Sequence, residues 1–104
     1  MSPVKVLHRL FLDQVRKFED GLDNNEEIGV YLASSADGRC LRVEKIGYRD
    51  PYFIILEGLI NDDQKAKLIQ HVTQISVLFI PLRVSSSENR QPRRFGFEIP
   101  DENP

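Results

Sequence analysis

The sequence predicts a small, mostly β domain with one N-terminal α-helix followed by five strongly bent antiparallel strands. Two observations predict this fold class. Apolar residues recur at steps of three and four from Val4 to Leu22, and afterwards at a step of two. Turns rich in glycine, asparagine and aspartate divide the later apolar runs into segments of strand length. With 104 residues, the chain is long enough for one domain with one core.

The helix is predicted over residues 3–20. Ser2 suits the N-cap and Pro3 suits the first helical position. The helix is expected to stop near Glu19–Gly21, where Gly21 can take the left-handed C-terminal position. Seven apolar residues form its amphipathic stripe, namely Val4, Leu7, Leu10, Phe11, Val15, Phe18 and Leu22.

Ile46 breaks the alternation of the second strand, so a bulge near Glu44 and Lys45 is expected to bend it. The stretch KLIQHVTQISVLFIPL is too long for one strand, so a turn at HVTQ should divide it in two. These elements place the domain within residues 1–84. The strands are predicted at about 27–33, 39–48, 52–60, 66–72 and 75–83.

Residues 85–104 have the polar composition of a flexible C-terminal tail. Phe95, Phe97 and Ile99 alternate within it, which leaves open an extra strand or an anchor on a neighbouring subunit. The stretch RQPRRFGF joins basic and aromatic residues, but acids follow it directly. A disordered tail is therefore favoured over a nucleic-acid contact.

Charge and composition restrict the function. The 14 basic and 16 acidic residues give a net charge of −2, whereas nucleic-acid-binding domains are usually basic. Residues 39–49 nevertheless hold four bases and one acid, so an acidic chain can still present a basic face. A single cysteine, Cys40, excludes an internal disulfide. Catalytic, phosphate-binding, metal-binding and membrane-spanning patterns are absent, which predicts a cytoplasmic non-enzyme without cofactor or metal.

Three stretches resemble the Sm-like family, in particular the bacterial RNA chaperone Hfq, over about residues 7–83. LHRLFLDQVRKFE resembles its N-terminal helix, VYLASSADGRCLRVEKIGYRDPYFIILEG its first three strands, and LIQHVTQISVLFIPLR its last two. The resemblance implies an SH3-like barrel whose fourth and fifth strands pair with neighbouring subunits to close a homo-oligomeric ring, commonly a hexamer. The chain also resembles short uncharacterised bacterial proteins that share IGYxxP and LIQHVxQ patterns, which implies no function.

The same resemblance implies which residues would contact single-stranded RNA. An adenine-stacking tyrosine on one face matches Tyr31, and arginines at the rim match Arg16 and Lys17. Each match has a structural alternative, such as a buried histidine, an interface aromatic or a solvated charge. The positions near the pore match His8, Arg9, either Tyr52 or Phe53, Gln70 and His71, with Gln70 standing where the family has lysine.

The leading hypothesis is a non-enzymatic ring that binds single-stranded RNA by stacking and electrostatics and acts in post-transcriptional regulation. A second hypothesis keeps the ring but assigns it to protein assembly or small-nucleotide capture, because the pore lysine is missing and the helix end is acidic. A third is a monomeric interaction domain in which FGFEI of the tail covers the strand within Lys67–Leu82.

Overall fold

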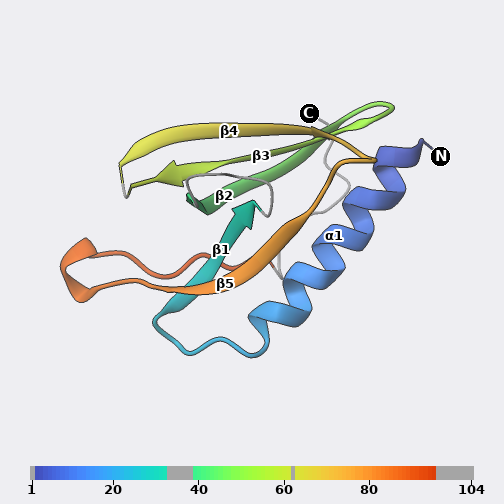
Figure 1. Ribbon diagram of the computed structural model, residues 1–104. Coiled ribbons are helices and arrows are strands. Elements are labelled where there is room, and N and C mark those ends of the chain that lie inside the picture. Colours follow the sequence, from blue (N-terminus) through green and yellow to red (C-terminus); the bar gives the residue numbers. More distant parts are fainter. Residues whose placement is uncertain (1, 33–38, 62, 96–104) are drawn as a thin grey trace.

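The computed structural model describes residues 2–32, 39–61 and 63–95, and it confirms one helix followed by five antiparallel strands (Figure 1). Each element begins and ends within two residues of its predicted position. No helix in these ranges is long and apolar enough to cross a membrane. The order is α1 (Pro3–Glu19), β1 (Glu26–Leu32), β2 (Cys40–Arg49), β3 (Phe53–Ile60), β4 (Gln64–His71), β5 (Val77–Arg83) and the short 3₁₀ turn η1 (Ser86–Glu88).

The start of α1 is fixed by its cap and by the sheet. The hydroxyl of Ser2 accepts a hydrogen bond from the N–H of Lys5 over 3.4 Å. The N–H of Val4 donates to the carbonyl of Pro51, in the turn between β2 and β3, over 3.0 Å. The helix N-terminus and that turn therefore lie side by side. One helix face is buried, through Val4, His8, Phe11, Leu12, Val15 and Glu19.

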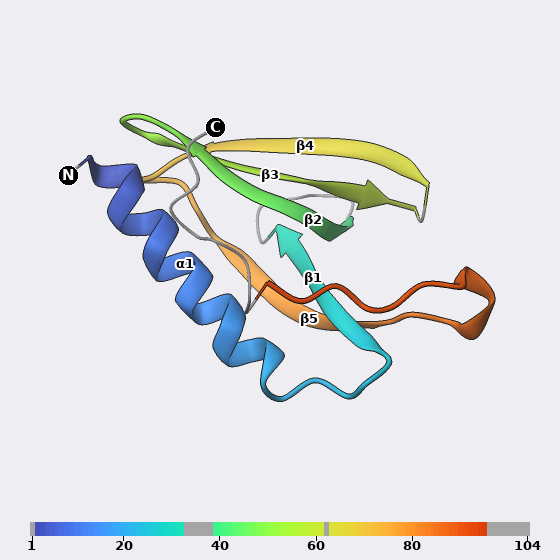
Figure 2. The ribbon, with the colours of Figure 1, turned by 180° about the vertical axis from the view of Figure 1, so that it is seen from behind.

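The five strands form a curved sheet in the order β4-β3-β2-β1-β5, and this sheet is not closed into a barrel. This finding corrects the closed barrel that the resemblance implied. β4 and β5 are the edges of the sheet, and within the described residues each pairs with one neighbour, β3 and β1 respectively. Figures 1 and 2 show α1 running along one side of the curved sheet.

β2 contains the predicted bulge, because its register with β3 shifts between Val43 and Lys45. Gly58 of β3 lies against this irregular segment. A Cβ atom added at Gly58 would lie only 1.9 Å from the carbonyl oxygen of Arg42. The close approach of β2 and β3 therefore requires a glycine at this position.

One apolar core joins α1 to the sheet, and Phe95 belongs to it. Phe95 is 6 % exposed, so the packed domain extends past the predicted boundary at residue 84. Of the alternating tail residues, Phe97 and Ile99 lie outside the described part of the chain. The other buried members of the core are Val4, Phe11, Val15, Ile28, Val30, Leu41, Val43, Tyr48, Ile54 and Leu56.

We expect Gly58→Ala to destabilise the domain by about 1–3 kcal/mol or more, because the new methyl group overlaps backbone that cannot move without breaking the sheet. Urea denaturation would measure the change in the free energy of unfolding. Gly21→Ala is the matched control, since its Cβ would meet the carbonyl oxygen of Phe18 at an ordinary 3.7 Å. Equal stability of the two variants would contradict the close approach at Gly58.

Candidate functional site

Three of the predicted site residues, Tyr52, Phe53 and His71, gather at one end of the sheet, and we call them the aromatic cluster. The ring centroids of Tyr52 and His71 lie 5.3 Å apart, and the rings are stacked at 21°. Phe53 meets His71 edge-on, with centroids 5.5 Å apart. Tyr52 and Phe53 remain 46 % and 40 % exposed. The cluster therefore offers an aromatic surface on which a nucleic-acid base can stack.

Backbone hydrogen bonds hold the aromatic cluster in place. The N–H of Val72 donates to the carbonyl of Tyr52 over 2.8 Å, and Phe53 is paired directly with His71 across β3 and β4. The N–H of Thr73 donates to Nδ1 of His71 over 3.2 Å. A neutral His71 therefore carries its proton on Nε2, and this N–H is the hydrogen-bond donor of the ring.

Gln70, which stands at the lysine position of the resemblance, points away from the aromatic cluster. Side chains alternate along a strand, so Gln70 lies on the core side opposite Ile54, while His71 lies on the other side opposite Phe53. The side-chain oxygen of Gln70 is buried and has no hydrogen-bond partner among the described residues. Arg9, the other cation implied for the pore, is exposed on α1.

His8 lies in the core and not on the surface. Its side chain is 3 % exposed, its Nε2 lies 3.3 Å from the carbonyl oxygen of Ile46, and its ring centroid is 4.8 Å from that of Tyr48. Burial lowers the pKa of His8, and the hydrogen bond to Ile46 only partly opposes this effect. In the single chain, His8 occupies the position of a structural histidine.

Tyr31 lies apart from the aromatic cluster, on the face of β1 that points away from the core, which we call the outer face of the sheet. It is half-buried and is paired with Cys40 of β2 and Leu78 of β5. At Gly29, on the same face, an added Cβ would lie 2.5 Å from Leu82 and 2.9 Å from Cys40. Burial raises the pKa of the Cys40 thiol. Tyr31 therefore stands on a closely packed, largely apolar surface.

The two cations matched to the rim differ in their surroundings. Lys17 is exposed and pairs with Asp13 one helical turn earlier, over 3.4 Å, an interaction of little energetic weight. Arg16 is half-buried, and its Nε atom is buried without a partner in the described part of the chain. Neither residue lies in the aromatic cluster.

Glu27 is a buried carboxylate that the sequence patterns do not single out. It is 1 % exposed. Arg90 binds it through two hydrogen bonds of 2.8 Å, Arg42 adds one of 2.9 Å, and the N–H of Arg93 adds one of 3.0 Å. Burial alone would raise the pKa of Glu27, but these hydrogen bonds outweigh burial and lower the pKa to about 2. Glu27 is therefore ionised at neutral pH.

The bonds to Glu27 hold residues 84–95, the C-terminal arm, against the sheet. Figure 2 shows the arm returning past β1 and β5 toward α1. The guanidinium of Arg94 donates to the carbonyls of Glu26 and Asp23 over 2.6 and 3.0 Å. The N–H of Phe95 donates to the Glu19 carboxylate over 2.8 and 3.0 Å. These described residues are thus an ordered part of the domain and not the flexible tail expected from composition.

Comparison with known proteins places the chain in a family. Residues 5–98 match a family of unknown function (DUF6173). The chain belongs to this family. No curated protein and no solved structure matches it. The matched range of the DUF6173 domain contains the whole C-terminal arm, whereas the Sm-like resemblance stops near residue 83.

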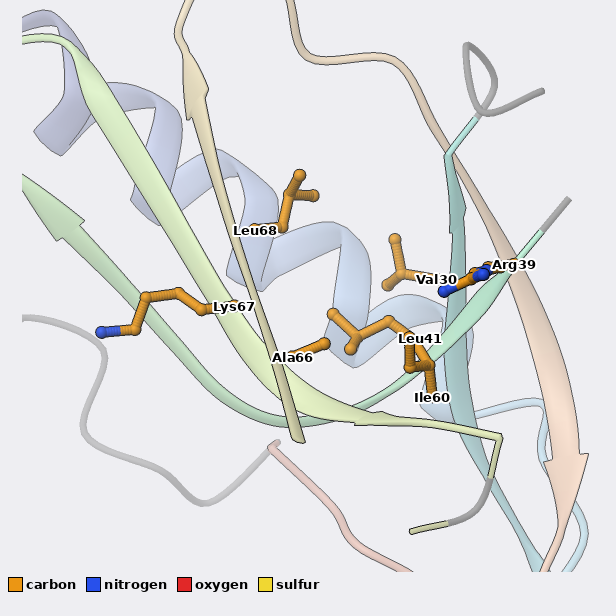
Figure 3. Close-up of a pocket in the computed structure, with 7 residues that line it drawn as sticks. All are labelled: Val30, Arg39, Leu41, Ile60, Ala66, Lys67 and Leu68. Carbon is orange, nitrogen blue, oxygen red and sulfur yellow. The ribbon is translucent and has the colours of Figure 1, made fainter. Parts of the chain in front are cut away.

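The DUF6173 domain also contains an apolar cavity of about 180 Å³, on the core side of β4 (Figure 3). Arg39 and Lys67 complete its lining, but the Lys67 side chain points away from it (Figure 3). Such walls fit an apolar group better than a nucleotide, whose polar edges need hydrogen-bond partners. No three His, Cys, Asp or Glu side chains gather as metal ligands in the described ranges. The apolar lining consists of Val30, Leu41, Ile60, Ala66 and Leu68.

We expect Glu27→Gln to lower the free energy of unfolding by about 3 kcal/mol at pH 7, the free energy that corresponds to the lowered pKa. The folded-state pKa of about 2 lies below the ordinary value of 4.5. The stabilisation by Glu27 is therefore complete above pH 4.5 and is lost as the pH falls toward 2.

The measurement is denaturant unfolding of wild type and Glu27→Gln between pH 2 and 7. The difference between the two proteins should shrink as the pH falls. Glu44→Gln is the control, because Glu44 bonds only one arm arginine, Arg93, in a partly exposed pair. A difference for Glu27→Gln that does not change with pH would contradict the buried carboxylate.

Proposed function

We propose that this chain assembles through the two edges of its sheet into an Sm-like homo-oligomeric ring, and that the ring binds single-stranded RNA without catalysing a reaction. Among residues 2–32, 39–61 and 63–95, β4 and β5 each pair on one side only, and this supports the assembly. An exposed strand edge is a template for pairing with another chain. If β4 of each copy pairs with β5 of the next, a closed ring leaves no free edge.

Two exposed apolar side chains carry the ring proposal. Ile69 on β4 is 57 % exposed, and Leu78 on β5 is 58 % exposed. Both lie on the outer face, since Ile69 is paired with Ile55 and Leu78 with Tyr31. Each therefore stands on an outermost strand of the described sheet, and both point to the same side of it. Pairing of the two edges would bring these side chains onto one continuous surface and remove apolar area from water.

The aromatic cluster carries the RNA-binding proposal. Tyr52 and Phe53 are exposed beside His71, and stacking on such rings contributes about 1–3 kcal/mol per base without demanding a particular sequence. Tyr31, on another part of the outer face, would supply a second stacking position. Repetition of both positions around a ring would turn weak single sites into tight binding of one RNA strand. Post-transcriptional regulation is the role that such binding would serve.

A ring that assembles proteins without binding RNA is the second candidate. The intramolecular bonds of the arm support it, because they occupy Arg90 and Arg94, cations that would otherwise attract phosphate. The net charge of −2 points the same way. Salt dependence separates the two candidates, since RNA binding weakens steeply with added salt and a protein scaffold responds much less.

We expect Ile69→Lys and Leu78→Lys each to convert the ring to smaller species, because a lysine on a strand edge opposes pairing with another chain. Light scattering would measure the mass of each variant in solution. Val6→Lys and Leu10→Lys are matched controls, because both residues are 55 % exposed but lie on α1. A wild-type monomer, or equal dissociation of edge and helix variants, would contradict assembly through β4 and β5.

We expect the wild type to bind labelled oligo-A and oligo-U more tightly at low than at high salt. Tyr31→Ala should weaken oligo-A binding by about fivefold to 150-fold, which corresponds to the loss of one stacked base at about 1–3 kcal/mol. Tyr31→Phe keeps an aromatic ring and should bind as the wild type does. Tyr52→Ala with Phe53→Ala should weaken oligo-U binding. A ring that binds neither oligonucleotide would favour the assembly role instead.

A further inference from the structure

The outer face of β2, β3 and β4 carries a group of exposed cations that the proposal above does not use. The strand register places Lys45 and Lys67 on either side of Glu57 in one cross-strand row. Lys65 lies two residues before Lys67 along β4, hence on the same face. Figure 3 shows the Lys67 side chain directed away from Ala66 and Leu68, which face the cavity.

A second row connects these lysines to the aromatic cluster. Arg49 is paired with Phe53, and Phe53 with His71. We call Lys45, Arg49, Lys65 and Lys67 the basic strip. All four side chains are exposed.

The charges of the basic strip are not neutralised within the described part of the chain, where no carboxylate forms an ion pair with any of its four members. Glu57 shares a cross-strand row with two of them, Lys45 and Lys67. Glu44, in the bulge of β2, is instead paired with Arg93 of the arm over 3.0 Å. A chain with a net charge of −2 thus presents a locally positive face.

We infer that the basic strip binds the phosphodiester backbone of the RNA strand whose bases stack on the aromatic cluster. This inference rests on the proposed function and names the residues that supply its electrostatic part. Neighbouring strands lie about 4.8 Å apart, so Lys45 and Lys67 are separated by roughly 10 Å across β3. Arg49 lies in the same cross-strand row as Phe53. An RNA strand whose bases stack on Phe53 therefore passes directly onto the basic strip.

The composition of the face favours a nucleic acid over an acidic peptide or a lipid surface. Along the outer side of β4, Lys65 and Lys67 are followed by Ile69 and then by His71 of the aromatic cluster. Cations, an apolar side chain and aromatic rings follow one another, which suits a ligand that alternates phosphates with flat bases. Within β4, Gln70 faces the core while Lys67 faces outward, so the outward lysine is the one available to a ligand on this face.

The first test is the salt dependence of oligonucleotide binding. For single strands, each lost phosphate contact lowers the slope of log K against log salt by about 0.7, or about fivefold in affinity at 0.1 M salt. Lys67→Gln should produce that change, and Lys45→Gln with Lys67→Gln should double it. Arg83→Gln is the charge-matched control, because Arg83 is exposed on β5, outside the strip, and it should leave the slope unchanged.

The second test predicts tighter binding of the oligonucleotide, a result that unfolding of the variant could not produce. Glu57→Gln removes the carboxylate between Lys45 and Lys67, so it should tighten oligonucleotide binding about two- to fivefold at low salt. Asp23→Asn changes the net charge equally but lies in the segment after α1, so binding should stay at the wild-type value.

The outcomes separate this inference from the proposed function. If the wild type binds oligonucleotides and Tyr52→Ala weakens binding, but the lysine variants keep the full slope, the basic strip is overturned and RNA binding stands. If the wild type binds neither oligonucleotide at low salt, the proposed function fails and the strip with it. If polyglutamate of matched length binds as tightly and loses affinity in the same lysine variants, the assignment to nucleic acid is overturned.

Discussion

The domain depends on one buried carboxylate that is fully supplied with donors. The carboxylate of Glu27 accepts four hydrogen bonds, which connect β1 to β2 and to the C-terminal arm. An ion pair in this position is not automatically stabilising, because removing charges from water costs several kcal/mol per ion. Because the carboxylate of Glu27 accepts hydrogen bonds from all of these donors, however, it holds the C-terminal arm in a single path. That path brings Phe95 into the apolar core and closes the domain.

The same arrangement explains how an acidic chain presents a basic surface. Two arm arginines are turned inward, Arg90 onto Glu27 and Arg94 onto the backbone around Glu26, while the side chain of Arg93 pairs with Glu44. Acids are concentrated at the end of α1 and the segment after it. On β2 and β4, the exposed cations without an ion pair in the described residues lie on the outer face, and Arg83 is a further exposed cation at the end of β5. The net charge therefore does not indicate where positive charge lies on the surface, whereas the register of the strands does.

The elements and their order could be predicted because local patterns specify them. The three- and four-residue spacing predicts α1, and the misplaced Ile46 predicts the bulge in β2. The HVTQ turn divides the two edge strands as expected. The open sheet could not be predicted in this way, because closure depends on how strands curve in space and not on alternation within each strand.

Three of the nine predicted site residues lie together in the structure. The resemblance matches one aromatic position to Tyr52 or Phe53 and another position to His71, and the strand register brings all three side by side. The same resemblance also matches His8 and Gln70, but both side chains face the core. Which face of a helix or strand is turned to the core becomes known only with the fold. Glu27 and Arg90 are 63 residues apart in sequence. No local sequence pattern connects these two residues. The polar composition of residues 85–104 predicts a flexible tail, so the ordered arm could not be predicted from it.

The Glu27 network also restricts how the DUF6173 family can vary. Replacing one partner alone would leave a charge buried without compensation, a costly change, whereas replacing the whole set with apolar residues can be neutral. Positions 27, 42 and 90 are therefore expected to change as a group between relatives. A relative that lacks the arm should carry an apolar residue at position 27, and its core would end where β5 ends.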